Sequence, residues 1–149
     1  MKKHILVLLL LSLGSSLLAQ EMKISYKALP AVVLQSFRTN YPNAGFKSAT
    51  KAISKGVAYY EINCKDGEAN RTISFDKDGN ITEKEEELTV DKLPDAVSKA
   101  LMKQYAQSKI IHIESSTKNS KTTYEVLIRD KKKKFEVVFS PEGKLVSTK

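Results

Sequence analysis

Three side chains in the stretch FDKDGN could coordinate a metal ion, because Asp76, Asp78 and Asn80 alternate before and after a glycine. A calcium loop of the EF-hand type needs a glycine at its sixth position and a helix on either side. Counted from Asp76, the sixth position is Ile81, and the flanking segments have the alternation of strands. We therefore interpret the stretch as a hairpin turn with Gly79 at a positive φ, and we expect no metal site.

Groups suited to catalysis are scarce in the rest of the chain. Beyond residue 20 there is a single histidine, His112, and a single cysteine, Cys64, so a zinc site has no ligand set. Glu61 and Glu125 are each preceded by a tyrosine, which allows a paired-carboxylate interpretation. We favour a structural one, in which lysines and threonines on neighbouring strands balance their charge. We expect no enzyme and no cofactor, and we interpret Cys64 as a core residue rather than a reactive thiol.

The first nineteen residues have the pattern of a secretory signal peptide. Lys2 and Lys3 precede an apolar run over residues 5–11, and small residues lead to Ala19. The apolar run is short for a membrane span, although a retained signal anchor remains the alternative. We expect an exported protein, periplasmic or secreted, whose single cysteine permits no internal disulfide.

The remaining chain repeats itself when it is shifted by 64 positions without a gap. The repeat pairs these residues: Leu29 and Leu93, Pro30 and Pro94, Val33 and Val97, Tyr41 and Tyr105, Tyr60 and Tyr124, Glu61 and Glu125, Asp66 and Asp130, Phe75 and Phe139, Gly79 and Gly143. An ungapped match of this length indicates a tandem duplication of one structural unit. We predict repeat units at residues 20–88 and 89–149.

Each unit reads as one helix followed by strands. Val33, Phe37 and Tyr41 recur every fourth position, as in an amphipathic helix, and the equivalent residues repeat the pattern. The stretches YYEINCK and TYEVLIR then alternate between apolar and polar residues. We predict an α+β fold in which each unit is a helix plus a four-stranded antiparallel meander. The junction EKEEELTVDKLP is too short for a flexible linker, so we expect one continuous sheet of roughly eight strands with both helices on one face.

These motifs together resemble a known family. LPAVVLQSFRTNYPNA, then YYEI or TYEV, then FDKDGNI, is similar to the PepSY-like domains, beta-lactamase-inhibitor-like modules of secreted bacterial proteins, often from Bacteroidetes. The second unit departs from the pattern, with FSPEGK in place of FDKDGN. The resemblance implies helices on one side of an open sheet. In beta-lactamase inhibitor proteins of this architecture, the open surface clamps a protein partner.

Charge separates the two units. Residues 20–88 hold ten basic and ten acidic residues, whereas residues 89–149 hold thirteen basic and seven acidic ones. The basic excess centres on a predicted hairpin turn that contains Lys131, Lys132, Lys133 and Lys134. These lysines either form a solvated tip that discourages edge-to-edge aggregation or contact an acidic protein, an anionic glycan or the membrane surface. We expect no nucleic-acid partner, because no aromatic residues interleave the lysines.

Our leading hypothesis is a non-enzymatic protein-binding module that uses the open sheet face. The candidate contacts are the residues predicted to point outward from that face: Tyr59, Glu61, Asn63, Thr72, Glu125, Leu127, Arg129, Glu136 and Val138. Leu127 and Val138 are apolar on an otherwise polar face, and exposed apolar residues often mark an interface. An inhibitor or chaperone of a secreted hydrolase is a sharper form of this hypothesis. The alternative is a polyanion or small-ligand binding protein that uses the lysine tip.

Overall fold

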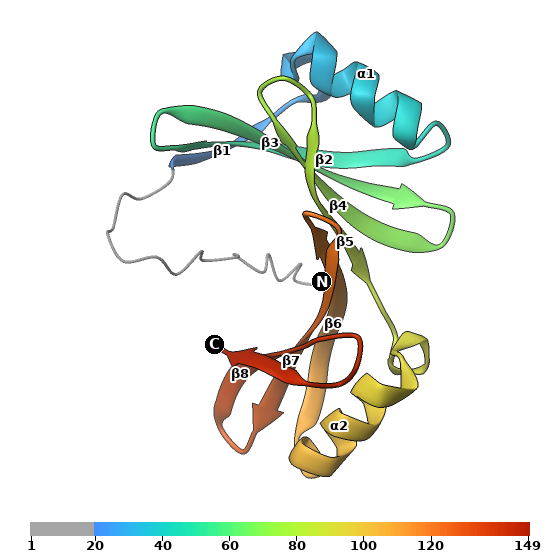
Figure 1. The fold of residues 1–149 in the computed structure, drawn as a ribbon. Helices are drawn as coiled ribbons and strands as arrows, with labels where there is room; N and C mark the ends of the chain where they lie inside the picture. Colours follow the sequence, from blue (N-terminus) through green and yellow to red (C-terminus); the bar gives the residue numbers. More distant parts are fainter. Residues whose placement is uncertain (1–19) are drawn as a thin grey trace.

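The computed structural model describes residues 20–149 as one antiparallel sheet with two α-helices (Figure 1). The predicted signal peptide, residues 1–19, lies outside the described residues. The chain begins with β1 (Gln20–Ile24), the 3-10 helix η1 (Tyr26–Ala28) and α1 (Ala31–Asn40). Four strands follow: β2 (Gly45–Ser54), β3 (Val57–Asp66), β4 (Ala69–Asp76) and β5 (Ile81–Glu87). The second half contains η2 (Val90–Lys92), α2 (Asp95–Tyr105), β6 (Lys109–Lys118), β7 (Lys121–Asp130), β8 (Lys133–Phe139) and β9 (Leu145–Thr148).

The sheet has nine strands in sequential order, each paired antiparallel with the next. The predicted α+β class and continuous sheet are therefore confirmed, but the expected strand count of about eight is too low. The additional strand is β1, whose residues pair with β2 from Glu21 opposite Ala52 to Ile24 opposite Ala49. Continuity depends on β5, which pairs with β4 on one side and β6 on the other.

Both helices pack against the same face of the sheet and form two hydrophobic cores. In the first core, Val33 and Phe37 of α1 pack over a set of buried sheet residues: Ala49, Tyr60, Ile62, Cys64, Ile73 and Phe75. In the second, Val97 and Leu101 of α2 pack over Ile113, Val126, Ile128, Val137 and Phe139. The alternation predicted for the strands is confirmed, and so is the assignment of Cys64 to the core.

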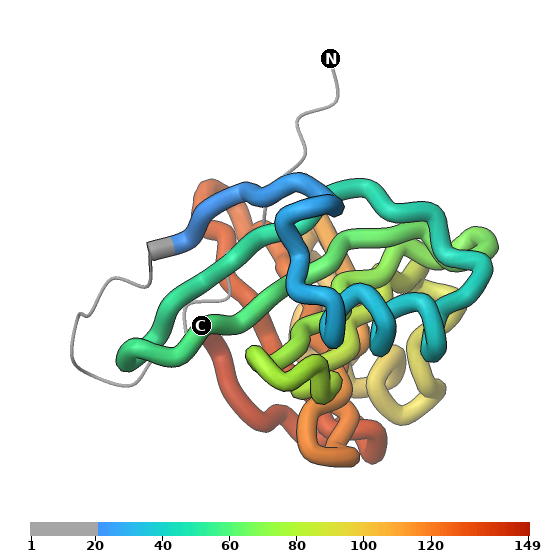
Figure 2. Tube along the Cα trace, turned by 90° about the horizontal axis from the view of Figure 1, so that it is seen from above, coloured from blue at the N-terminus to red at the C-terminus, as the bar shows by residue number. Residues whose placement is uncertain are grey.

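The sheet twists strongly between its halves. Figure 2 shows the first strands crossing the strands of the second half at a wide angle, as the accumulated right-handed twist of a long sheet predicts. In Figure 1 the two helices lie at opposite ends of the arched sheet, on its outer side. The opposite face of the sheet, which we call the open face, has no helix on it among residues 20–149. None of the helices in this range is long and apolar enough to cross a membrane.

The stretch FDKDGN forms the hairpin turn between β4 and β5. Asp76 accepts backbone hydrogen bonds through Oδ1 from Asp78 and Asn80, both at 2.9 Å, so its carboxylate orders the turn. A hydrogen bond from the Asn80 side chain is the main reason that the pKa of Asp76 is lowered. Gly79 has φ of 83° and Gly143, in the equivalent turn between β8 and β9, has φ of 78°. The predicted glycine turns are confirmed.

The same two glycines also allow each hairpin to approach a helix. A Cβ atom on Gly79 would lie 2.7 Å from the carbonyl oxygen of Val32 in α1. One on Gly143 would collide with the carbonyl of Ala96 in α2. Each glycine is therefore required both for its backbone conformation and for contact between the hairpin and its helix.

Candidate functional site

The open face carries polar side chains because the strands alternate and the helices cover the other side. Residues directly opposite each other in an antiparallel pair share a face. Glu61 on β3 lies opposite Ser74 on β4, which in turn lies opposite Glu83 on β5. Farther along the sheet, Glu114 on β6 lies directly opposite Glu125 on β7.

Glutamates gather on this face. Glu21 on the edge strand β1 is one of them, and we call the seven others the acidic array. They come from β3, β5, β6, β7 and β8: Glu61, Glu83, Glu85, Glu87, Glu114, Glu125 and Glu136. The three on β5 alternate in sequence, so all of them point to the open face. Like charges placed directly opposite each other destabilise a sheet. The negative charge of the array must therefore be offset by hydrogen-bond donors, basic side chains or protonation.

Three basic side chains and one hydroxyl supply part of that compensation. Ser116 donates a hydrogen bond to Glu83 Oε1 at 2.7 Å, and Lys118 Nζ lies 3.4 Å from Glu83 Oε2. The imidazole Nε2 of His112 lies 3.1 Å from Glu114 Oε2, a hydrogen bond that is the main reason for the raised pKa of this histidine. The third base is Lys149, which lies beside Glu125 and Glu136.

Glu85, at the centre of the array, is not among the hydrogen-bonded or ion-paired glutamates of the described chain. It lies opposite Thr72 on β4 and Ser116 on β6. Burial, and to a lesser extent the nearby charges of Glu114 and Glu83, raises the pKa of its carboxyl to about 8. Burial likewise raises the pKa of Glu61. At neutral pH the centre of the array therefore holds a protonated carboxyl group.

Glu125 is the most deeply buried member of the array. Its residue is only 6 % exposed, and burial followed by a hydrogen bond with Glu136 raises its pKa to about 7. The Nζ atom of Lys149 is 3.6 Å from Glu125 Oε2 and 3.3 Å from Glu136 Oε1. Glu125 Oε2 has no hydrogen-bond partner within residues 20–149. The carboxylate is thus surrounded more by other acids than by donors.

The structure places all nine predicted contact residues on the open face. Two of them are neighbours in the first half, where Thr72 donates a hydrogen bond to Asn63 at 2.9 Å. Tyr59 is 39 % exposed at the edge of this half, and Arg129 is exposed near the lysine tip. The predicted contacts are therefore spread over the sheet, and only Glu61, Glu125 and Glu136 belong to the acidic array.

One expectation about this face is wrong. Val138 is only 4 % exposed, because Glu125 on β7 and Ser147 on β9 flank it on both sides. It is a buried residue and not an exposed apolar contact, whereas Leu127 is partly exposed. Glu125 lies directly opposite Glu114, and the lysine beside it is Lys149, whose Nζ atom is 3.6 Å from Glu125 Oε2. Glu61 does lie between Thr50 and Ser74.

The predicted contact residues did not include four members of the array: Glu83, Glu85, Glu87 and Glu114. A usable signal was present, because alternate positions in EKEEE all hold glutamate and a strand places alternate positions on one face. Glu114 has no such signal, since its position beside Glu125 follows only from the pairing of β6 with β7.

The lysine tip lies apart from the array. Lys131 and Lys132 form the turn between β7 and β8, and Lys133 and Lys134 begin β8. All four side chains are exposed. The predicted hairpin turn is confirmed, with Lys131 at φ of 54°.

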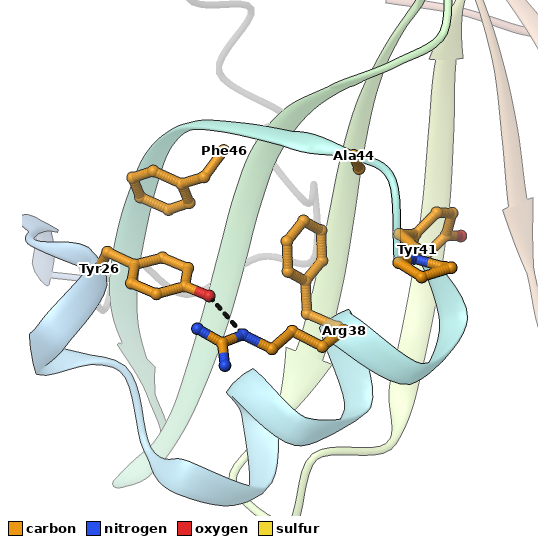
Figure 3. A pocket seen from close by; sticks show the side chains of 7 residues that line it. Tyr26, Arg38, Tyr41, Ala44 and Phe46 are labelled. Carbon is orange, nitrogen blue, oxygen red and sulfur yellow. Dashed lines mark hydrogen bonds between the residues drawn. The ribbon is translucent and has the colours of Figure 1, made fainter.

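A hollow of about 450 Å³ lies between α1 and the start of β2, on the helix side of the sheet (Figure 3). Arg38 Nε donates a hydrogen bond to the Tyr26 hydroxyl at 2.8 Å, and Phe46 packs edge-on against the Tyr26 ring. These contacts hold η1 against the helix and strand. The hollow therefore belongs to the packing of the first core and lies away from the acidic array.

Comparison with known protein families identifies the fold. The sequence model of the family described as "Putative beta-lactamase-inhibitor-like, PepSY-like" matches residues 17–81 and again residues 58–147. The chain belongs to the PepSY-like family. Two overlapping matches in one PepSY-like chain are consistent with the repeated sequence pattern. The chain matches none of the proteins of curated function at a significant level.

Several solved structures share this PepSY-like fold. A BLIP-like protein from Bacteroides fragilis is 27 % identical, with a TM-score of 0.68 over 81 % of this chain and 86 % of that one. A protein from Bacteroides eggerthii, described as a putative periplasmic protein, is 17 % identical, with a TM-score of 0.71 over 80 % and 87 % of the two chains. A DUF2874 family protein from Bacteroides uniformis is 18 % identical, with a TM-score of 0.71 over 81 % and 88 %.

Proposed function

We propose that this protein is an exported, non-enzymatic module that binds another protein through the open face of its sheet. The observation that carries the proposal is the open face itself. It is one face of a nine-stranded antiparallel sheet, and burial and the neighbouring negative charges disfavour the ionised form of its central glutamate, Glu85. Buried groups of like charge destabilise the folded state, and such groups are typical of functional surfaces.

Family membership supports a binding role over a catalytic one. The family is described as beta-lactamase-inhibitor-like, and a BLIP-like protein shares the fold at 27 % identity. An inhibitor-like or regulatory partner of an envelope or secreted protein is the form of the proposal that these relatives favour. The description of one structural neighbour as a putative periplasmic protein supports export, with residues 1–19 as a signal peptide. The sequence repeat supports two units at residues 20–88 and 89–149.

Site-specific photo-crosslinking tests the proposal. A photoreactive amino acid is placed at Leu127 or Tyr59 on the open face, and at Met102 on the outer surface of α2 as a matched control. Met102 is 69 % exposed, so its access to solvent is at least as good. We expect one protein of the envelope or secreted fraction to crosslink from Leu127 or Tyr59 and not from Met102, and to bind the purified protein stoichiometrically. Equal crosslinking from all three positions, or none, would contradict the proposal.

A polyanion-binding role for the lysine tip is the second candidate. Its supporting observation is the set of four exposed lysines at one hairpin turn. Such a role predicts binding to an anionic glycan that weakens as salt screens the charges. It also predicts that binding survives neutralisation of the acidic array.

A further inference from the structure

The charge of the acidic array opposes the charge of the protein as a whole. The full chain carries a formal net charge of +8, yet the seven glutamates of the array share one face of the sheet. Only Lys118, His112 and Lys149 form ion pairs with them within residues 20–149. The open face therefore attracts cations, while the rest of a basic protein repels them.

A second feature of the array calls for a hydrogen-bond donor. Glu125 is more than nine-tenths buried and lies opposite Glu114, with Glu136 diagonal to it on β8. Its Oε2 atom has no hydrogen-bond partner in the described chain, and the Lys149 ammonium lies 3.6 Å from it. A buried acceptor without a donor is unfavourable. Either a proton or a cationic N–H group from another molecule can satisfy it.

The position of Lys149 illustrates how such a cation would be held. Its ammonium group lies within 4 Å of both Glu125 and Glu136, but it is 44 % exposed and forms no hydrogen bond with Glu125 Oε2. A guanidinium group has donors arranged to bind two carboxylate oxygens at once, which a lysine ammonium cannot match. Glu114, Glu125 and Glu136 lie on three neighbouring strands of the open face and provide several carboxylate oxygens there.

We propose that the acidic array binds an arginine-bearing segment of a partner protein, with at least one guanidinium group beside Glu114, Glu125 and Glu136. The inference rests on the proposed function, since it names the chemistry of the partner for the same open face. Charge complementarity is its basis, together with the unsatisfied oxygen of Glu125. A metal ion is not favoured as the occupant, because residues 20–149 contain no group of three or more side chains placed to hold one.

The protonation state of the array gives the proposed arginine-bearing partner a measurable consequence. The pKa of Glu85 is raised to about 8 and that of Glu125 to about 7, so both carboxyls are largely neutral below these values. A bound guanidinium favours the ionised form, and binding must therefore release protons near neutral pH. The charged groups that face Glu85 and Glu125 from the packed strands are Glu61, Glu83, Glu87, His112, Glu114, Lys118, Glu136 and Lys149.

Calorimetry with the purified chain from residue 20 to 149 tests the inference. The probe is a synthetic peptide of four Arg-Ser repeats, and the control peptide has citrulline in place of arginine. We expect the arginine peptide to bind at least about tenfold more tightly than the citrulline peptide. We also expect tighter binding at pH 8 than at pH 6, with net proton release at pH 7 when two buffers of different ionisation enthalpy are compared. Equal binding of both peptides, or no proton release, would overturn the inference.

A matched pair of variants locates the binding. The double variant Glu114→Gln and Glu125→Gln neutralises the array. The control, Glu68→Gln and Glu142→Gln, makes the same change in net charge at two exposed turn positions. We expect the array variant to lose at least about tenfold in affinity and the control to stay within about threefold of the unmodified protein. Equal losses in both variants would contradict binding at the array.

The outcome separates this inference from the proposed function. If a partner crosslinks from Leu127 but binds the array variant with unchanged affinity, the proposed function stands and the arginine inference fails. If no partner crosslinks from the open face, the proposed function fails whether or not the arginine peptide binds.

A second copy of this chain could instead insert its lysine tip into the array. Concentration-dependent dimers that the array variant abolishes would overturn the arginine-bearing partner in favour of self-association.

Discussion

Replacing Glu85 by glutamine removes the ionisable group at the centre of the acidic array while keeping its size. The pKa of this glutamate rises from 4.5 to about 8 in the folded protein, chiefly through burial and then through Glu114 and Glu83. Because the folded state binds the proton more tightly than the unfolded state, its stabilising contribution is fully present below about pH 4.5. That contribution is lost progressively as the pH rises toward 8.

The size of the effect follows from this pKa difference. Each pH unit between the two pKa values corresponds to about 1.4 kcal/mol. At pH 7 the unmodified protein is therefore destabilised, relative to pH 4, by on the order of 3 kcal/mol through this one group. This value is an upper one, because water reaches part of the carboxylate and neighbouring glutamates adjust their protonation.

Urea unfolding followed by circular dichroism measures the effect, because the chain contains no tryptophan. We expect Glu85→Gln to raise the free energy of unfolding by about 1–3 kcal/mol at pH 7–8 and to leave it nearly unchanged at pH 4. Glu68→Gln, at the exposed turn between β3 and β4, is the control and should change stability by less than about 0.5 kcal/mol. A Glu85→Gln variant with the same stability difference at pH 4 and pH 8 would refute the reasoning.

Three further predictions concern the turns, the core and the lysine tip. Gly143→Ala should lower the free energy of unfolding by about 3 kcal/mol, because alanine is strained at φ of 78° and its Cβ collides with Ala96. Gly67→Ala, at φ of 60° in open space, should cost only about 1 kcal/mol in the same urea titration. Leu101→Ala should destabilise the protein by about 2–5 kcal/mol, whereas the adjacent exposed Met102→Ala should stay within about 0.5 kcal/mol. Similar unfolding midpoints for these two variants would contradict the placement of α2. Replacing Lys131 to Lys134 by serine should abolish salt-sensitive retention on a sulfated-glycan column if the tip binds polyanions, and unchanged retention would exclude the tip.

Local patterns predicted the cores and the turns well. The alternation in YYEINCK is a property of the strand itself, so Tyr60, Ile62 and Cys64 could be assigned to the helix-facing side without knowing their strand partners. Gly79 and Gly143 were predictable for a similar reason, since a positive φ favours glycine. The first strand was missed because apolar and polar residues alternate only weakly in QEMKI. This segment forms a strand by pairing with β2, which the local sequence does not reveal.

The candidate site depends on long-range pairing, which the sequence does not state. Glu114 and Glu125 face each other only because β6 pairs with β7 in one register, with a bulge between Ile110 and His112. A shift by one residue would move every side chain of a strand to the other face. The burial of Val138 has the same origin, because it depends on β9 pairing at the edge of the sheet.

The acidic array and the lysine tip predict opposite responses to pH, which allows the two candidate functions to be separated. Raising the pH from 6 to 8 ionises carboxyl groups whose pKa lies near 7 or 8, as for Glu125 and Glu85, and should strengthen binding of a cationic segment. An ordinary lysine keeps its proton throughout that range, so binding of a polyanion at the tip should weaken or stay constant. High salt weakens both interactions and cannot separate them. A partner whose affinity rises with pH therefore binds the array, and one whose affinity does not rise binds elsewhere.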